Sequence, residues 1–116
     1  MGRSLAGMVY GVGAVKLTAD EKAEIKRSLA DCLSADPEVQ RVVVFGSFLT
    51  SPDPHDVDVA VFQSSQERYL PLALRYRRRV RPVAKTIPVD VIPVRAQPVP
   101  GPMTAEIERG EVIYER

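Results

Sequence analysis

The chain has 116 residues and a net charge of +1, and 45% of its residues are apolar and 27% charged. This is an ordinary globular balance in which the overall charge favours no class of partner, and no apolar run is long enough to cross a membrane. The single cysteine, Cys32, excludes a disulfide within the chain and suits the reducing cytoplasm. We therefore expect a cytoplasmic protein with one domain over residues 16–116, which follows a flexible, glycine-containing arm over residues 1–15.

The domain is expected to begin with a helix. Thr18 and Glu21 match a capping box, in which each side chain accepts a hydrogen bond from the backbone of the other residue. Apolar residues recur at helical spacing from Ile25 onward. The helix should end near Ala35, because Pro37 disfavours helical backbone in the residue before it.

Two β-branched, apolar runs over residues 41–45 and 56–62 predict buried strands. Between them lie the turn-prone pair Gly46 and Ser47 and a loop over residues 50–55, in which two prolines exclude regular structure. This connection leaves room for about one helical turn but not for a helical crossover. Part of the sheet is therefore expected to be antiparallel.

A second helix is expected from a capping box at Ser64 and Glu67 to about Val80, where Pro82 stops it. The residues expected on its buried face are Tyr69, Ala73, Tyr76 and Val80. A third strand follows over residues 86–94, and its prolines mark it as an edge strand or an irregular one.

The rest of the chain predicts a stiff connector over residues 97–102, a short helix over residues 104–109, Gly110 as its C-cap and a last strand over residues 111–114. The fold class predicted by this order of elements is α/β (α+β). It is a mixed sheet with helices packed mainly on one of its faces.

Three aspartates stand out as candidate metal ligands. Asp56 and Asp58 are two residues apart in a predicted strand, so they point to the same face and repel one another unless a cation lies between them. Hard oxygen ligands of this kind suit Mg²⁺ or Mn²⁺. Asp90 lies in an apolar strand, and it completes a three-carboxylate cluster if that strand lies beside the Asp56 strand.

Gly46 and Ser47 are the candidate phosphate-binding residues. A glycine directly after a buried strand lets the backbone turn sharply and approach a ligand closely. Ser47 then offers a hydroxyl and an N–H group to a phosphate.

The order strand, Gly46-Ser47, loop, Asp56-Val57-Asp58 and a later strand with Asp90 resembles the polymerase-β-type nucleotidyltransferase superfamily. It is most similar to the minimal, MntA-like nucleotidyltransferases that often partner HEPN-domain (HepT-type) proteins. The resemblance implies a nucleotidyltransferase-like fold, a nucleotide-binding Gly46-Ser47 turn and catalytic aspartates that hold Mg²⁺. It also implies transfer of a nucleoside monophosphate, AMP from ATP, to a hydroxyl. One implied acceptor is a tyrosine of a HEPN-type toxin, which would make this chain an antitoxin that acts by AMPylation.

Two other functions stay open at this point. One is a small-molecule nucleotidyltransferase of the antibiotic-modifying kind, and the other is a non-catalytic module that neutralises a partner by contact. So short a chain predicts an open active site or a partner that completes it, either a HEPN-type protein or a further copy of the chain.

The arginine run over residues 75–81 is either a docking surface for phosphate, RNA or an acidic partner, or the solvated face of a helix. Binding of nucleic acid is not favoured, because no aromatic platform accompanies the run.

Overall fold

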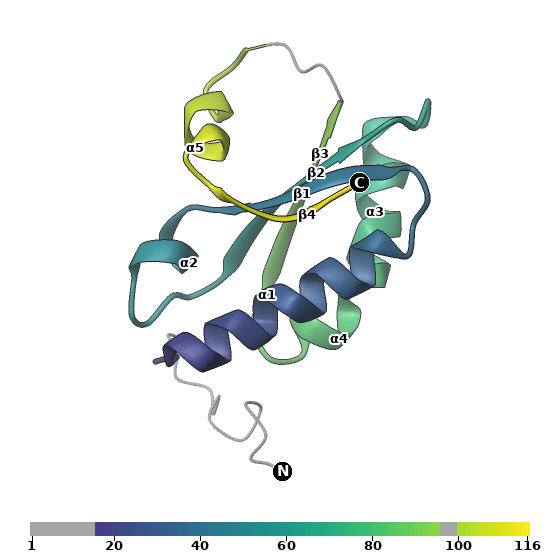
Figure 1. The fold of residues 1–116 in the computed structure, drawn as a ribbon. Coiled ribbons are helices and arrows are strands. Elements are labelled where there is room, and N and C mark those ends of the chain that lie inside the picture. The colour runs from purple at the N-terminus through teal and green to yellow at the C-terminus, as the bar shows by residue number, and fades with distance from the viewer. Residues whose placement is uncertain (1–15, 96–99) are drawn as a thin grey trace.

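A computed structural model describes residues 16–95 and 100–116, so the arm expected over residues 1–15 lies outside the described residues. The chain forms a four-stranded mixed sheet with helices packed against it (Figure 1). The strands are β1 (Val39–Phe45), β2 (Val57–Gln63), β3 (Val89–Arg95) and β4 (Glu111–Glu115), and the helices are α1 (Ala19–Ser34), α2 (Ser47–Thr50), α3 (Tyr69–Arg79), α4 (Arg81–Ala84) and α5 (Thr104–Glu108). The predicted fold class is confirmed.

The sheet has the strand order β3-β2-β1-β4. β1 pairs antiparallel with β2, as expected for two strands joined without a helical crossover, and it also pairs antiparallel with β4. β2 pairs parallel with β3, and α3 and α4 form the crossover between them. β3 lies at an edge, which confirms the position predicted from its prolines.

Two clusters of apolar side chains lie on opposite faces of the sheet. The larger cluster joins α1 and α3 to one face, with Leu29, Tyr76 and Val59 all fully buried. The smaller cluster lies on the other face, where Ile107 of α5 packs against residues such as Val43. Helices therefore cover mainly one face, as predicted, and α5 lies over one end of the other (Figure 1).

The capping box of α1 is present as predicted. The Thr18 hydroxyl accepts from the Glu21 N–H at 3.1 Å, and Glu21 Oε1 accepts from the Thr18 N–H at 2.9 Å. α1 ends at Ser34 with Ala35 as its C-cap. Among the described residues, no helix is both long and apolar enough to cross a membrane.

The second predicted capping box, at Ser64 and Glu67, is wrong. α3 begins only at Tyr69, and its N-cap makes no side-chain hydrogen bond. Ser65 rather than Ser64 is buried, and its hydroxyl accepts from the Glu67 N–H at 2.9 Å, which closes a tight turn instead of a helix. Because α3 starts at Tyr69, that side chain stays 58% exposed and does not join the predicted buried face.

Pro82 also behaves differently from the prediction. α3 ends at Arg79, and Pro82 lies in the first turn of the next helix, α4, where its missing N–H leaves no hydrogen bond unmade.

Part of the arginine run holds the fold together. Arg75 pairs with Asp36 at 3.1 Å, with Glu38 at 2.7 Å and with Glu67 at 2.9 Å. Arg79 approaches the same buried Asp36 at 3.4 Å. These two arginines therefore tie α3 to the turn after α1. Residues 77, 78 and 81 of the run remain exposed.

Gly110 has a different role from the predicted helix cap. Its backbone is not in the left-handed region, since Gly46 is the glycine with positive φ among the described residues. A Cβ at Gly110 would instead lie 2.6 Å from the Val44 carbonyl oxygen and 2.7 Å from Val43 Cγ1. Glycine is needed here because the chain between α5 and β4 presses directly against β1.

Gly110→Ala should therefore lower the free energy of unfolding by about 2 kcal/mol, since backbone atoms must move to admit the methyl group. Chemical denaturation measures this loss, with Glu108→Ala at an exposed position as the matched control. Equal stability of the two variants would contradict the close packing of Gly110.

Candidate active site

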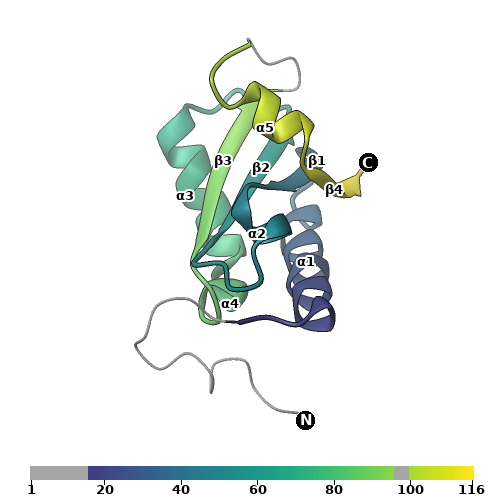
Figure 2. The ribbon, with the colours of Figure 1, turned by 90° about the vertical axis from the view of Figure 1, so that its left-hand side faces the viewer.

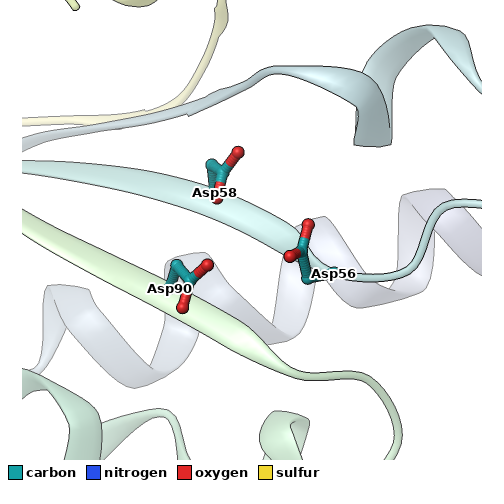
Figure 3. A group of neighbouring side chains, drawn as sticks. All are labelled: Asp56, Asp58 and Asp90. Carbon is teal, nitrogen blue, oxygen red and sulfur yellow. The ribbon is translucent and has the colours of Figure 1, made fainter.

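The parallel pairing of β2 and β3 brings the three candidate carboxylates together. Asp58 of β2 lies directly opposite Asp90 of β3, and Asp56 immediately precedes β2. The intervening valines, Val57 and Val59, are buried on the other face of the sheet. Each aspartate offers a carboxylate oxygen, and these oxygens lie within 4.8 Å of one another (Figure 3).

The cluster carries uncompensated negative charge. Burial, together with the charges of Asp56 and Asp90, raises the pKa of the Asp58 carboxyl to about 6. In the part of the chain that the structure describes, no basic side chain forms an ion pair with any of the three. A bound cation would relieve this repulsion.

The donor set fits a divalent metal ion. The site consists of carboxylate oxygens alone, which favour hard cations such as Mg²⁺ and Mn²⁺. Asp56 and Asp58 are partly buried, whereas Asp90 is exposed and remains open to a substrate. The three aspartates could therefore hold a metal and still leave one side of it free.

Gly46 links the turn after β1 to this cluster. Its φ of 82° and ψ of −158° lie in a region that favours glycine. A Cβ at this position would also lie 2.8 Å from Asp58 Oδ2. Glycine thus allows both the sharp turn into α2 and the close approach of the Asp58 carboxylate. α2 is a single turn that starts at Ser47, as the short connection predicted.

A cavity of about 460 Å³ with a mixed polar and apolar lining opens beside this turn. One wall comes from Gly46, Ser47 and the rest of α2, and the other from Glu106 and Arg109 at α5. Figure 2 shows α2 and α5 at the same end of the sheet. Gly46 lines this cavity and lies against the Asp58 carboxylate, so the cavity adjoins the carboxylate cluster.

Sequence reasoning did not find Glu106 and Arg109 as candidate site residues. The short helix that carries them was predicted, but its place opposite the Gly46-Ser47 turn depends on the pairing of β4 with β1. The one signal in the sequence is Gly110, whose close approach to β1 fixes the end of that helix.

A second, mainly apolar cavity of about 480 Å³ lies on the same face of the sheet as the carboxylates. Its floor is formed by Phe62, Ile92 and Val94, which continue the rows of Asp58 and Asp90 along β2 and β3. Ile107 and the 41% exposed Met103 form its far side. The carboxylates thus lie between this apolar cavity and the one beside the Gly46-Ser47 turn.

Asp58→Asn should stabilise the metal-free protein at pH 7.5. With the pKa of Asp58 raised to about 6, the native state binds more protons than the unfolded state between pH 4 and 6. Stability is therefore lost as the pH rises through this window. Removing the charge should recover about 1 kcal/mol after solvent screening, or about 4 °C in Tm.

Calorimetry at two pH values checks this prediction. The gain should shrink at pH 4.5, where Asp58 is already protonated, and Asp31→Asn at an exposed position of α1 should show no gain. A Tm that falls in Asp58→Asn at pH 7.5 would contradict the repulsion.

Comparison with known families identifies the family of this chain. The sequence model of the family described as "Polymerase beta, Nucleotidyltransferase" matches residues 27–116, a segment that contains Gly46, Ser47 and all three aspartates. Among curated proteins, none matches the chain. Since the matched segment covers well over half of the residues and holds the carboxylate cluster beside the glycine turn, the chain belongs to the polymerase β nucleotidyltransferase family.

Proposed function

We propose that this protein is a metal-dependent nucleotidyltransferase that transfers AMP from ATP to a hydroxyl group. The observation that carries the proposal is the cluster of Asp56, Asp58 and Asp90 beside the Gly46-Ser47 turn. Membership of the polymerase β nucleotidyltransferase family supports nucleotidyl transfer as the general reaction.

Each aspartate has a role in this proposal. Asp56, Asp58 and Asp90 hold Mg²⁺ or Mn²⁺. The closeness of their carboxylate oxygens and the repulsion between their charges favour a bound cation. The metal, when bound, supplies positive charge to the triphosphate and makes the acceptor hydroxyl more acidic. Asp90 either helps to hold the metal or, because it is exposed, acts as the general base that takes up the proton of that hydroxyl.

The bond changes follow from this arrangement. The acceptor oxygen forms a bond to the α-phosphorus of ATP, and the bond from that phosphorus to the bridging oxygen of the β-phosphate breaks. Pyrophosphate leaves through the cavity beside α2, where Gly46 and Ser47 bind the phosphates during the reaction. The proton of the acceptor passes through Asp90 to solvent.

The proposed acceptor is a tyrosine of a HEPN-type protein partner, so that the chain acts as the antitoxin of a toxin–antitoxin pair. An open site suits an acceptor presented by a second protein. The apolar cavity beside Asp90, with Ile92 on its floor and the exposed Met103 at its far side, is large enough to take an aromatic side chain.

A labelling experiment tests the activity. The protein is mixed with α-labelled ATP, Mg²⁺ and a HEPN-type protein encoded by a neighbouring gene. We expect label on a tyrosine of the partner, reduced at least about a hundredfold in Asp56→Asn and Asp58→Asn because the metal is lost. The exposed-site variant Asp31→Asn serves as the control and should transfer label normally.

Label that persists in the two aspartate variants would overturn the catalytic assignment. A stable complex with no label from any nucleoside triphosphate would show instead that the chain neutralises its partner by contact.

Metal binding gives an independent prediction. Mg²⁺ should raise the Tm at pH 7.5 by mass action on the native state, and EDTA should reverse the rise. The effect should fade below about pH 6, because protons compete with the cation for the Asp58 carboxylate. Differential scanning calorimetry measures the shift. Asp90→Asn should abolish it, and an unchanged shift in that variant would place the metal elsewhere.

A further inference from the structure

We propose that Arg109 binds the polyphosphate chain of the nucleotide and supplies the positive charge of the protein in the cleft. The inference rests on the proposed function and adds to it a binding residue on the wall opposite the Gly46-Ser47 turn.

The first argument is position. Arg109 is the C-cap of α5 and lines the same 460 Å³ cavity as Gly46 and Ser47. Two neighbours fix its backbone there. Ile107 packs into the apolar cluster on the face of the sheet that carries the carboxylates, and Gly110 lies against the Val44 carbonyl. The side chain therefore starts from a rigid point across the cavity from the turn.

The second argument is charge. The other ionisable residue that lines this cavity is Glu106, and the adjoining cluster consists of three aspartates. A nucleoside triphosphate is itself strongly anionic, so it meets repulsion from every ionisable group of the site except Arg109. The planar guanidinium can give two parallel hydrogen bonds to phosphate oxygens, which suits it to this ligand.

The third argument is that the fold does not use this guanidinium. Arg109 is exposed, and within residues 16–95 and 100–116 its side chain forms no ion pair, even with Glu106 one helical turn away. Two other basic side chains are used by the fold in this way. Arg75 binds three carboxylates, and Lys22, beside α2, donates to the Ser51 carbonyl at 2.5 Å.

Binding of a non-hydrolysable ATP analogue tests the proposal. Isothermal titration with Mg²⁺ present compares the full chain with Arg109→Ala, Arg109→Lys and Arg78→Ala. Arg78 is the matched control, because it is also exposed but lies on α3, on the other face of the sheet. We expect about tenfold weaker binding in Arg109→Ala, partial recovery in Arg109→Lys and wild-type binding in Arg78→Ala.

Two further readouts separate an ionic contact from a structural role. The difference in affinity for the ATP analogue between Arg109→Ala and wild type should narrow as the salt concentration rises, because an exposed ionic contact is screened. The Tm of Arg109→Ala should equal that of wild type, since no contact of the fold is lost.

The outcomes are distinguishable. If wild type binds the analogue and Arg109→Ala binds it equally well, the inference is overturned and the proposed function stands. A loss of binding that is independent of salt and accompanied by a lower Tm also overturns the inference, because Arg109 would then be structural. If wild type binds no nucleoside triphosphate analogue, both the proposed function and the inference that rests on it are overturned.

Discussion

The site depends on the register between β2 and β3. This pairing sets Asp58 opposite Asp90 and so forces like charges together, which opposes folding unless a cation is present. The buried valines on the reverse face, such as Val59 and Val91, hold the register against this repulsion. A shift by one residue would turn the valines outward and the carboxylates into the core. The hydrophobic core therefore fixes the position of the charged cluster.

Gly46 connects the turn after β1 to the carboxylate cluster. A side chain there would occupy the space that the Asp58 carboxylate needs, so the turn and the cluster share one packing contact. α5, the third part of the site, is held in place by two contacts. Ile107 packs on the face of the sheet that carries the carboxylates, and Gly110 lies against β1. The cleft is thus built from the middle and from the C-terminal part of the described chain, which meet where β1 ends.

How much the sequence could predict depended on how local each feature is. Strand alternation alone placed Asp56 and Asp58 together, whereas the place of Asp90 needed a strand pairing that was inferred from the pattern and is present. The Ser64 cap failed because an adjacent serine makes a competing turn. Arg109 was missed because its approach to the glycine turn is a long-range contact, for which Gly110 is the one signal in the local sequence.

The position of β4 at the sheet edge affects how the cleft can open. β4 has five residues, pairs with β1 alone, and leaves side chains such as Val112 exposed. Detaching such a strand disrupts far less buried surface than separating β1 from β2. Because α5 is connected to β4, local unfolding of this edge would move the Arg109 wall away while the carboxylates stay in place. The stability of the cleft therefore depends on the peripheral α5–β4 segment, and it can differ from the global stability of the protein.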